Sequence, residues 1–588
     1  MNNMSLPRSH VFENAVSQVE AWLDGHGAAF VKRCASKSAG GPRPAEWEFS
    51  IEHPALGTTN AWLVLPDEFP AAQVQIQLRE DMCLRLPHVE ETGKVCLPNL
   101  VQADDFENPA EAVKRAVAAF EEFLRNCEDP DWVAKEFCKE APSYWVRFCS
   151  SNSSKARRGK QNSAIRVGHL WSEPFIQCTT GSAAIYADGA CVLCLGVADP
   201  TDIARRHRIN PGTVRMAEAL YVEVPIELAW TPVIWPTSRA ALERLVDAVT
   251  GHPKCFADWF ESIGRNKRKA SGARKPYQGL VVFVQGGVPY GVQVFTAAQS
   301  IQGLPEVLPF NVRRIDPAWA LARDQKLHKL DALRGKRLLV IGCGSLGSPL
   351  IELLARSGVG HMDIVDDQDF ASENCARHIL GATSIGLKKA TQLATKLTVE
   401  VPGAMVKGIV AKAVKLLCTE CKPGNYDMVI ECTGETTVRT ALTRMQRGAV
   451  GKVPVAYTWV EPFCAAAHVV LTTGLDQWPA HDPADALVNV AAWPDGSGLV
   501  EIPACGSGFQ PYGASDVWQA AGFAAERILS VLGTEVAEAT VWSWMRTRAF
   551  FDSLGIAVAP RDIVPRHGGQ LDSATTTRRL QDVLGAHG

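Results

Sequence analysis

The chain has 588 residues, of which 46% are hydrophobic, a composition typical of a globular protein with more than one domain. Its 60 basic and 63 acidic side chains leave a net charge of −3, which excludes a general electrostatic attraction to nucleic acid or anionic membranes. No apolar run is long enough to span a membrane, and the first residues lack the apolar core of a secretory signal. We therefore expect a cytoplasmic protein whose 17 cysteines are reduced.

The first 149 residues predict an α+β domain. An opening helix is indicated by apolar residues at helical spacing: Phe12, Val16, Val19 and Leu23. Alternating apolar residues predict three strands, over 47–51, 61–65 and 74–78. A second apolar helical face follows Asn108. The polar stretch 150–163 contains a single apolar residue, Ala156, so we expect a linker there.

The middle segment, residues 164–316, has a mixed α/β pattern and carries no motif that we assign. Its basic stretch 265–275 has no aromatic residues between the charges, which favours a solvated loop over a nucleic-acid patch. Two cysteine pairs have the spacing of zinc ligands: Cys191 with Cys194, and Cys418 with Cys421. The pairs lie in different segments, whereas structural zinc needs four ligands together, so we assign no metal ligand.

Residues 317–588 alternate strands with helices, and this order predicts an α/β, doubly wound parallel sheet of the Rossmann type. The predicted strands are 337–341, 361–365 and 427–431. The predicted helices are 349–356, a long helix around 388–397, and 514–532.

A glycine-rich loop, Gly342-Cys-Gly344-Ser-Leu-Gly347, joins the first of these strands to the first helix. Such a loop directs backbone N–H groups and the positive end of a helix toward phosphate groups. Asp366 stands 24 positions after Gly342, where an acid that binds a ribose hydroxyl is expected. Loop and acid together predict a nucleotide site, and by themselves they fit NAD as well as ATP.

The residues that follow separate the two nucleotides. The segment 366–377 resembles the signature of the ubiquitin-activating and ThiF/MoeB family, with Asn374 eight positions after the acid and Arg377 three positions further on. Lys389 occupies the family's lysine position in a Gly-x-x-Lys-Ala motif. The resemblance implies that the domain binds ATP and Mg²⁺ and adenylates the C-terminal carboxylate of a protein. Arg377 and Lys389 are then expected to offset the charge that develops at the α-phosphate.

One motif departs from this family. Where the family usually has Asp-Cys-Thr-Asp-Asn, with magnesium on the second aspartate, this chain reads Glu431-Cys-Thr-Gly434-Glu435. We therefore expect either Glu435 or the nucleotide phosphates to hold the metal. Arg439 matches the arginine that follows in the family, and Arg323 is a remnant of its Arg-x-x-Arg-Gln motif.

An acyl-adenylate reacts readily with a thiol, and a cysteine in the last domain fits this task. Cys505 lies in a loop of small residues before the predicted helix 514–532 and resembles the cysteine loop of bacterial activating enzymes. Small neighbours allow the close approach of a protein tail. Cys464, the competing candidate, lies in an apolar strand-like run and is expected to belong to the core.

A second thiol is predicted in the first domain. The segment from Leu86 to Leu97, with Gly93-Lys-Val-Cys96 at its end, resembles the active-site segment of ubiquitin-conjugating enzymes, His-Pro-Asn-Val-x-x-x-Gly-x-Ile-Cys-Leu. The resemblance implies that Cys96 accepts a thioester. His88 stands where that family has the asparagine thought to support the oxyanion. A histidine there can donate the hydrogen bond, and it can also titrate near neutral pH.

An activating-type domain and a conjugating-type domain in one chain resemble the fusion enzymes of bacterial CBASS antiphage operons. The resemblance implies a relay in which a partner's C-terminal carboxylate is adenylated, passed to Cys505, passed to Cys96 and joined to an amine. The implied partner is a cGAS-like nucleotidyltransferase, and the implied assembly is a homodimer.

Four other functions stay open. An enzyme of the same kind that serves a dedicated bacterial ubiquitin-like protein would carry the same residues. A sulfur-carrier activating enzyme would share the ATP chemistry but leave the first domain without a purpose. A catalytically degenerate nucleotide-binding scaffold is favoured slightly by Gly434 and His88. An NAD oxidoreductase is disfavoured by Asn374, Arg377 and Lys389.

Overall fold

The computed structural model describes residues 10–25, 30–32, 45–54, 56–98, 100–156, 164–175, 177–209, 212–270, 279–295, 305–322, 327–419, 423–446, 453–473, 478–479, 481–494, 500–501, 508–509, 511–532, 534 and 538–585. It divides into two compact units, Met1–Thr201 with Gly212–Arg314, and Asp202–Pro211 with Ile315–Gly588. Within the described residues, no helix has the length and apolar character that crossing a membrane requires.

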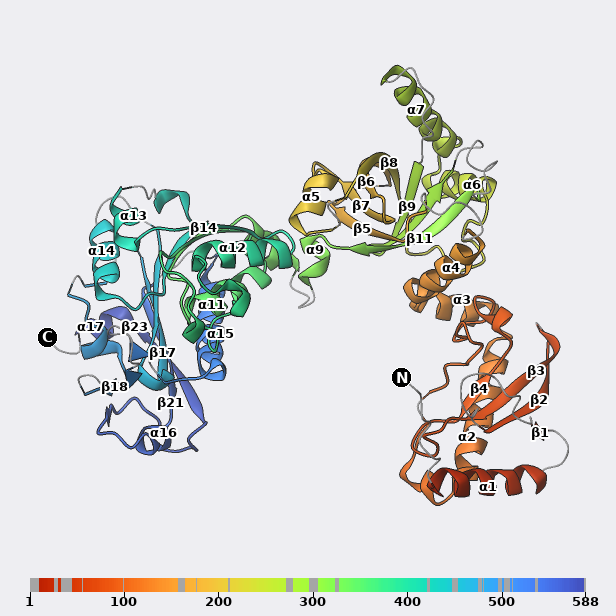
Figure 1. The fold of residues 1–588 in the computed structure, drawn as a ribbon, viewed down its shortest axis with the longest axis horizontal. Coiled ribbons are helices and arrows are strands. Elements are labelled where there is room, and N and C mark those ends of the chain that lie inside the picture. Colours follow the sequence, from red (N-terminus) through yellow and green to blue (C-terminus); the bar gives the residue numbers. More distant parts are fainter. Residues whose placement is uncertain are drawn as a thin grey trace. The chain divides into compact units, whose positions relative to one another are not determined.

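The N-terminal domain packs two helices, α1 (His10–Gly25) and α2 (Pro109–Asn126), into one core with a sheet (Figure 1). The sheet is antiparallel, and its strands follow chain order: β1 (Phe30–Lys32), β2 (Ala45–His53), β3 (Gly57–Leu65) and β4 (Gln75–Gln77). The predicted opening helix and the three predicted strands are confirmed, because the apolar residues that revealed them are those that form the core.

Helices α3 (Pro130–Lys139) and α4 (Ala141–Ala156) follow this domain. Helix α4 packs against the next domain through an aromatic cluster: Trp145, Phe148, Trp230, Trp235 and Tyr290. The linker predicted over 150–163 is wrong at its start, since α4 continues to Ala156. There the side chains of Ser150 and Asn152 donate hydrogen bonds to helix carbonyls one turn earlier, so polar residues extend the helix without burying a face.

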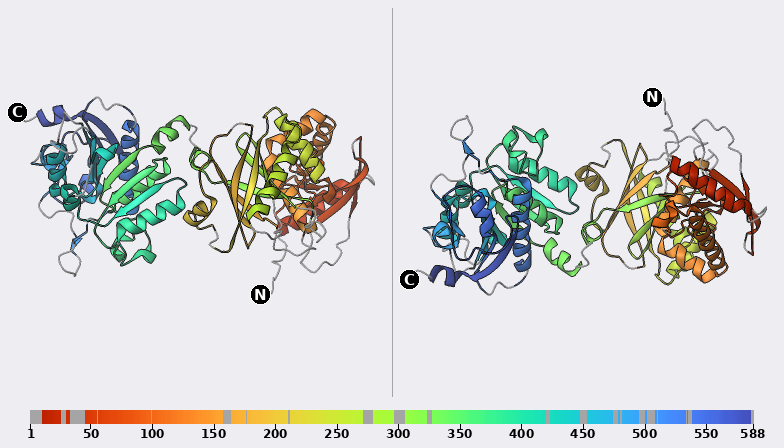
Figure 2. Two further views of the ribbon diagram at one scale, coloured as in Figure 1. Left: turned by 90° about the horizontal axis from the view of Figure 1, so that it is seen from above. Right: turned by 90° about the horizontal axis from the view of Figure 1, so that it is seen from below.

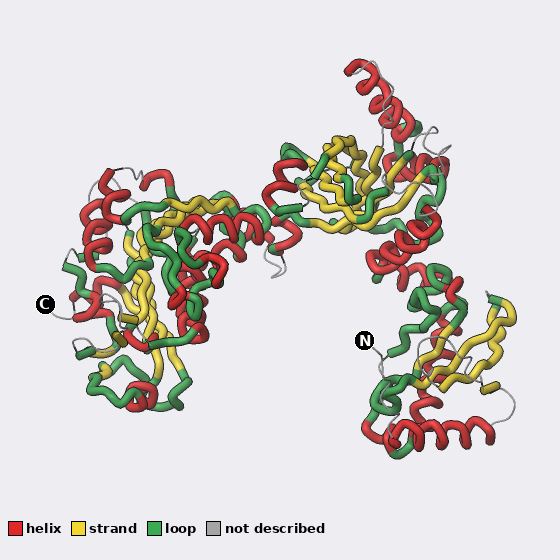
Figure 3. The backbone as a smooth tube through the Cα atoms, in the orientation of Figure 1, coloured by secondary structure: helices red, strands yellow, loops and turns green. Residues whose placement is uncertain are grey.

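The middle segment forms a closed barrel of strands (Figure 3). Its strand order is β10-β11-β5-β7-β6-β8-β9. Its strands are β5 (Val167–Ser172), β6 (Cys178–Tyr186), β7 (Ala190–Leu195), β8 (Val214–Glu223), β9 (Gly279–Gln285), β10 (Val288–Val294) and β11 (Val307–Arg314). Its helices are α6 (Arg239–Thr250) and α7 (Cys255–Ala270). Helix α5 (Pro200–Arg206) lies between β7 and β8 in the sequence, but from Asp202 onward it belongs to the second unit. The loop predicted over 265–275 is wrong as far as Ala270, because α7 continues to that residue.

The second unit is built on one sheet in the order β14-β13-β12-β15-β16-β17-β21-β23. Its strands are β12 (Arg337–Ile341), β13 (His361–Val365), β14 (Met405–Ile409), β15 (Met428–Glu431), β16 (Val455–Val460), β17 (Ala466–Thr472), β21 (Thr540–Arg546) and β23 (Ser573–Arg579). The strands from β14 to β16 are parallel, as predicted, whereas β17, β21 and β23 are added antiparallel.

Helices cover both faces of this sheet (Figure 2). One face shares a core with α11 (Gly347–Arg356), α12 (Lys389–Glu400) and α15 (Ala514–Val531). The other face shares a core with α13 (Ala413–Thr419), α14 (Thr436–Gln446) and α17 (Leu580–Gly585). Shorter elements complete the unit: α9 (Pro317–Ala320), α10 (Leu327–Arg334), α16 (Arg548–Ser553), β18 (Ala491–Ala492) with β22 (Ala559–Pro560), and β19 (Val500–Glu501) with β20 (Gly508–Phe509). The carboxyl ends of the parallel strands meet at one edge, where ligands bind in such sheets.

Candidate functional site

The glycine-rich loop connects β12 to α11 at this edge, and its glycines have different roles. Gly342 has a φ of 101°, and a Cβ at Gly347 would lie 2.1 Å from the Gly342 carbonyl oxygen, so the turn itself requires both glycines. Gly344 differs, since a Cβ there would meet no atom of the described residues within 4 Å. The missing side chain at Gly344 leaves open space in the loop, as a bound phosphate group requires.

Asp366 follows β13 and holds the loop in place. Its Oδ2 accepts a hydrogen bond from the Cys343 N–H at 2.8 Å, and its Oδ1 accepts one from the Gln368 N–H at 2.8 Å. A carboxylate has about four acceptor sites, so Asp366 can accept a further donor such as a ribose hydroxyl.

A buried histidine supports the same loop from the other side. His378 Nε2 lies 2.7 Å from the Cys343 carbonyl oxygen, and its Nδ1 accepts a hydrogen bond from the Leu380 N–H at 3.0 Å. Burial lowers the pKa of His378 to about 4, so the ring is neutral at pH 7 and its proton lies on Nε2. No sequence motif indicates His378, although it lies next to Arg377.

Lys389 is the first residue of α12, and its side chain is buried. Its Nζ donates a hydrogen bond to Gln368 Oε1 at 2.8 Å. The neighbouring Lys388 forms an ion pair with Asp369 at 2.9 Å. Gln368, which no sequence motif indicates, therefore positions Lys389, the lysine of the Gly-x-x-Lys-Ala motif.

A cleft of about 390 Å³ opens beside the loop. It is lined by the backbone of Gly344 and by the polar residues Asp366, Gln368, Thr433 and Glu435, among others. Ala411, Val414 and Val438 add an apolar wall. A few polar groups on an apolar wall are typical of a small-molecule site.

Arg377 is placed by a residue from the far end of the chain. Its guanidinium lies over the Tyr512 ring, 4.7 Å from the ring centroid. The Tyr512 hydroxyl lies 2.8 Å from Oγ of Ser345, which belongs to the glycine-rich loop. Tyr512 therefore joins the predicted phosphate-binding arginine to the loop. Asn374 has a local contact, since its Oδ1 accepts a hydrogen bond from the Ala371 N–H at 3.1 Å.

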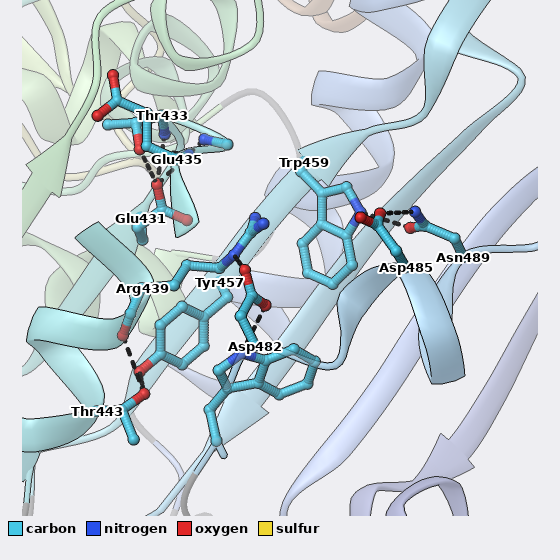
Figure 4. A network of polar contacts seen from close by, with 12 residues as sticks. Glu431, Thr433, Glu435, Arg439, Thr443, Tyr457, Trp459, Asp482, Asp485 and Asn489 are labelled. Atoms are coloured by element: carbon cyan, nitrogen blue, oxygen red, sulfur yellow. Dashed lines mark hydrogen bonds and ion pairs between the residues drawn. The ribbon is translucent and has the colours of Figure 1, made fainter. Parts of the chain in front are cut away.

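The motif that departs from the family pattern begins with a buried carboxyl group, that of Glu431 (Figure 4). Glu431 Oε1 accepts hydrogen bonds from the N–H groups of Thr433 at 2.6 Å and Gly434 at 3.2 Å. Its Oε2 has no hydrogen-bond partner among the described residues. Burial raises the pKa of Glu431 to about 7. Glu435, by contrast, is exposed and lines the cleft, so it is the carboxylate of this motif that a metal can reach.

Arg439 belongs to a buried network behind this motif. Its Nε donates to Asp482 Oδ2 at 2.8 Å, and its guanidinium lies 5.1 Å from the centroid of the Trp459 ring (Figure 4). Both partners of the ion pair are almost fully buried, with side-chain exposures of 7% and 3%. The contacts of Arg439 are therefore structural.

In the N-terminal domain, a tight turn presents Cys96 to solvent. Gly93 has a φ of 83°, and a Cβ there would lie 1.9 Å from the Leu78 carbonyl oxygen, so only glycine fits. Cys96 Sγ donates a hydrogen bond to Glu90 Oε1 at 3.3 Å. Desolvation and the adjacent Glu90 carboxylate raise the pKa of Cys96 to about 11, so the resting group is a thiol.

His88 has a left-handed backbone with a φ of 59°, and its imidazole faces α3. Its Nε2 lies 3.2 Å from Glu136 Oε2, and its backbone N–H donates to the Tyr144 hydroxyl at 2.6 Å. Its carbonyl accepts the Cys96 N–H at 2.7 Å. His88 thus supports the cysteine through its backbone, while its ring is held by Glu136.

The remaining candidates divide into buried residues and residues outside the described part. Cys464 is buried, as expected, and Cys191 and Cys194 are buried on β7. Cys505, Arg323 and Cys421 lie outside the described residues. The described part of the chain holds no group of three or more His, Cys, Asp or Glu side chains arranged to bind a metal.

Comparison with known proteins gives three kinds of matches. Residues 318–449 match the ThiF family. The ATP-dependent ubiquitin transferase-like protein Cap2 of Vibrio cholerae is 32% identical over 232 residues, which cover 38% of this chain and 39% of that relative. Its namesake in Pseudomonas aeruginosa is 28% identical over 222 residues, covering 35% of this chain and 38% of the relative. The structure of E. coli MccB with ATP aligns with a TM-score of 0.29 at 13% identity, over 38% of this chain and 68% of that one.

This chain thus matches about two fifths of the length of the two Cap2 relatives. The matches confirm the resemblance to the bacterial activating enzymes that the motifs indicated. The second unit carries a ThiF-family domain.

Proposed function

We propose that this protein is an ATP-dependent ligase that adenylates the C-terminal carboxylate of a partner protein and passes the acyl group through two thiols to an amine. One observation carries the proposal: the open space at Gly344 adjoins a cleft lined by Asp366 and Gln368, in a domain that matches the ThiF family. The name of the Cap2 relatives, ATP-dependent ubiquitin transferase-like protein, supports the same chemistry.

In the first step, the carboxylate attacks the α-phosphorus of ATP, the bond to the β-phosphate oxygen breaks, and pyrophosphate leaves. The loop N–H groups and the N-terminus of α11 bind the phosphates, and Asp366 accepts a ribose hydroxyl. Arg377 and Lys389 offset the charge of the transition state. Mg²⁺ neutralises phosphate charge when bound, and Glu435 is the exposed carboxylate that would hold it together with the phosphates.

The acyl group then moves between thiols. The Cys505 thiolate attacks the acyl carbonyl carbon and AMP leaves, after which the Cys96 thiolate displaces Cys505 from the thioester. The nitrogen of the acceptor amine finally attacks the carbonyl carbon of the Cys96 thioester, the C–S bond breaks, and the proton lost by the nitrogen passes to the departing Cys96 thiolate, which leaves an amide. Glu90 accepts a hydrogen bond from the Cys96 thiol and is therefore placed to receive the thiol proton when the thiolate forms.

The domain roles follow from this relay. Residues 1–149 serve as the ubiquitin-conjugating-like domain, residues 164–316 as the linker domain and residues 317–588 as the activating domain. The resemblance to CBASS fusion enzymes makes a cGAS-like nucleotidyltransferase the proposed partner and a homodimer the proposed assembly. A dedicated ubiquitin-like protein is the alternative partner, and identifying the adduct distinguishes the two.

The test is a mass spectrum of the protein isolated under denaturing, non-reducing conditions from cells that also express its neighbouring genes. We expect a thiol-sensitive adduct on Cys96 or Cys505 that ends in the partner's C-terminal residue. Cys505→Ala should still exchange pyrophosphate into ATP but lose both adducts, and Cys96→Ala should keep the Cys505 adduct and make no amide. Loading of Cys96 in the Cys505→Ala protein would refute the relay order, and unmodified protein under these conditions would favour the degenerate scaffold.

A further inference from the structure

The second unit ends in an exposed sheet edge. β23 is the last strand of the sheet, and its residues alternate between exposed and half-buried. The Leu580 N–H, directly after the strand, donates to the Ala539 carbonyl on the β21 side at 3.0 Å. Because the direction of the N–H groups alternates along an antiparallel strand, the N–H groups of Thr575, Thr577 and Arg579 point away from β21. Among the residues that the structure describes, no strand pairs with this edge, which therefore offers backbone donors and acceptors to a further strand.

A large cavity lies at the carboxyl end of the same strand. It has a volume of about 760 Å³ and is lined by Arg561, Thr577, Arg578, Arg579 and Asp582, with Leu487 among its apolar residues. Three arginines face one aspartate, so positive charge exceeds negative charge in the lining.

Two of these arginines have only neutral partners in the part of the chain that the structure describes. Arg578 Nη2 donates to the Val488 carbonyl and to Ser543 Oγ, each at 3.3 Å, and its buried Nε has no partner. Arg561 Nη2 donates to the Asp485 carbonyl at 2.5 Å. Burial and the nearby positive charge of Arg561 lower the pKa of Arg578, and both guanidinium groups line the same cavity. An incoming carboxylate would offset these positive charges and accept bidentate hydrogen bonds.

The third arginine differs. Arg579 Nε forms an ion pair with Glu538 at 3.1 Å, and both side chains are largely exposed. Exposed pairs of this kind contribute little to stability, and charged side chains on an edge strand ordinarily discourage pairing with other chains. Arg561 and Arg578 line the same cavity and differ from Arg579 in being half-buried and in donating only to neutral acceptors within the described residues.

We propose that β23 and this cavity form a docking site for an extended acidic segment of a partner protein. The segment adds a strand to the free edge of β23 and places a carboxylate between Arg561 and Arg578. A peptide fits both features at once, since the strand edge supplies backbone hydrogen bonds and the arginines select negative side chains. The inference does not rest on the proposed ligase activity, because it concerns binding along the outer side of β23 and not at the carboxyl ends of the parallel strands, where the nucleotide cleft lies.

The test measures binding of a fluorescein-labelled peptide of five Thr-Glu repeats to the full-length protein by fluorescence anisotropy, without ATP. We expect saturable binding that is about tenfold weaker for five Thr-Gln repeats, and about tenfold weaker for Arg561→Gln or Arg578→Gln. Thr577→Pro should weaken binding by a similar factor, since proline removes an outward N–H but leaves the β21 ladder intact. Thr577→Val, which keeps that N–H, is the matched control and should bind as the unchanged protein does.

Circular dichroism and thermal unfolding of each variant show whether the chain is folded, and Thr575→Pro provides a second edge variant. Equal binding of the Thr-Gln peptide, or undiminished binding by both proline variants, would overturn the proposal. So would failure of the Thr-Glu peptide to bind. Tighter binding of a single-stranded oligonucleotide that depends on Arg561 and Arg578 would make this a nucleic-acid site instead. None of these outcomes depends on pyrophosphate exchange, so failure of the ligase proposal would be seen separately.

Discussion

Replacing Gly344 by alanine tests whether the open space in the glycine-rich loop is a phosphate site. The new Cβ would have no atom of the described residues within 4 Å, and Gly344 is not among the residues with positive φ. We therefore expect Gly344→Ala to fold normally, with a free energy of unfolding that is unchanged or raised by up to about 1 kcal/mol. The added methyl group occupies space that the structure leaves empty and that a phosphate would need.

The size of the effect follows from the hydrogen bonds at stake. A backbone N–H that donates to a charged phosphate oxygen contributes about 1.5–3 kcal/mol. Losing one such bond weakens ATP binding by about 10- to 150-fold, since 1.4 kcal/mol corresponds to a factor of ten. The loss should appear as a raised KM for ATP in pyrophosphate exchange with the partner present.

Gly347→Ala is the matched control for this experiment. Its Cβ would lie 2.1 Å from the Gly342 carbonyl oxygen, so this variant should lose stability as well as exchange. A Gly344→Ala protein with normal stability and an unchanged KM for ATP would refute the assignment of the loop as a phosphate site.

Three further predictions concern single polar contacts. Glu90→Gln should lower the pKa of Cys96 from about 11, because it removes the carboxylate that disfavours the thiolate. The pH profile of Cys96 alkylation, followed by mass spectrometry, should then move to lower pH. An unchanged profile would contradict the contact between Glu90 and Cys96. Tyr512→Phe should raise the KM for ATP by about two- to tenfold through loss of the hydrogen bond to Ser345, and a wild-type KM would show that this bond does not position the loop. The raised pKa of Glu431 means that its contribution to stability is present below its ordinary value of 4.5 and is lost as pH rises through about 7. Thermal unfolding between pH 5 and 8 should therefore show a smaller decline for Glu431→Gln than for the unchanged protein, and parallel curves would disprove the shift.

Contiguous stretches of sequence determined the local parts of both sites. The turn at Gly93 and the loop from Gly342 to Gly347 each bring their functional atoms together within a few residues, so spacing alone reveals them. The same holds for the helices and strands whose apolar periodicity matches their burial, such as α1 and the parallel strands of the second unit. Which face of a helix or strand is buried depends only on the spacing of its apolar residues, and that spacing can be read directly from the sequence.

Tertiary structure alone decided which distant residues complete these sites. Tyr512 reaches Ser345 across 167 positions, and Tyr144 on α4 receives the N–H of His88 across 56. The closed barrel of the middle segment, the antiparallel strands beyond β16 and the arginine-lined cavity at β23 likewise depend on how elements pair. Periodicity shows that a residue is buried or exposed but not which partner it meets. Strand pairing and side-chain contacts between remote segments are set by the packing of the whole unit, and a single sequence carries no direct record of them.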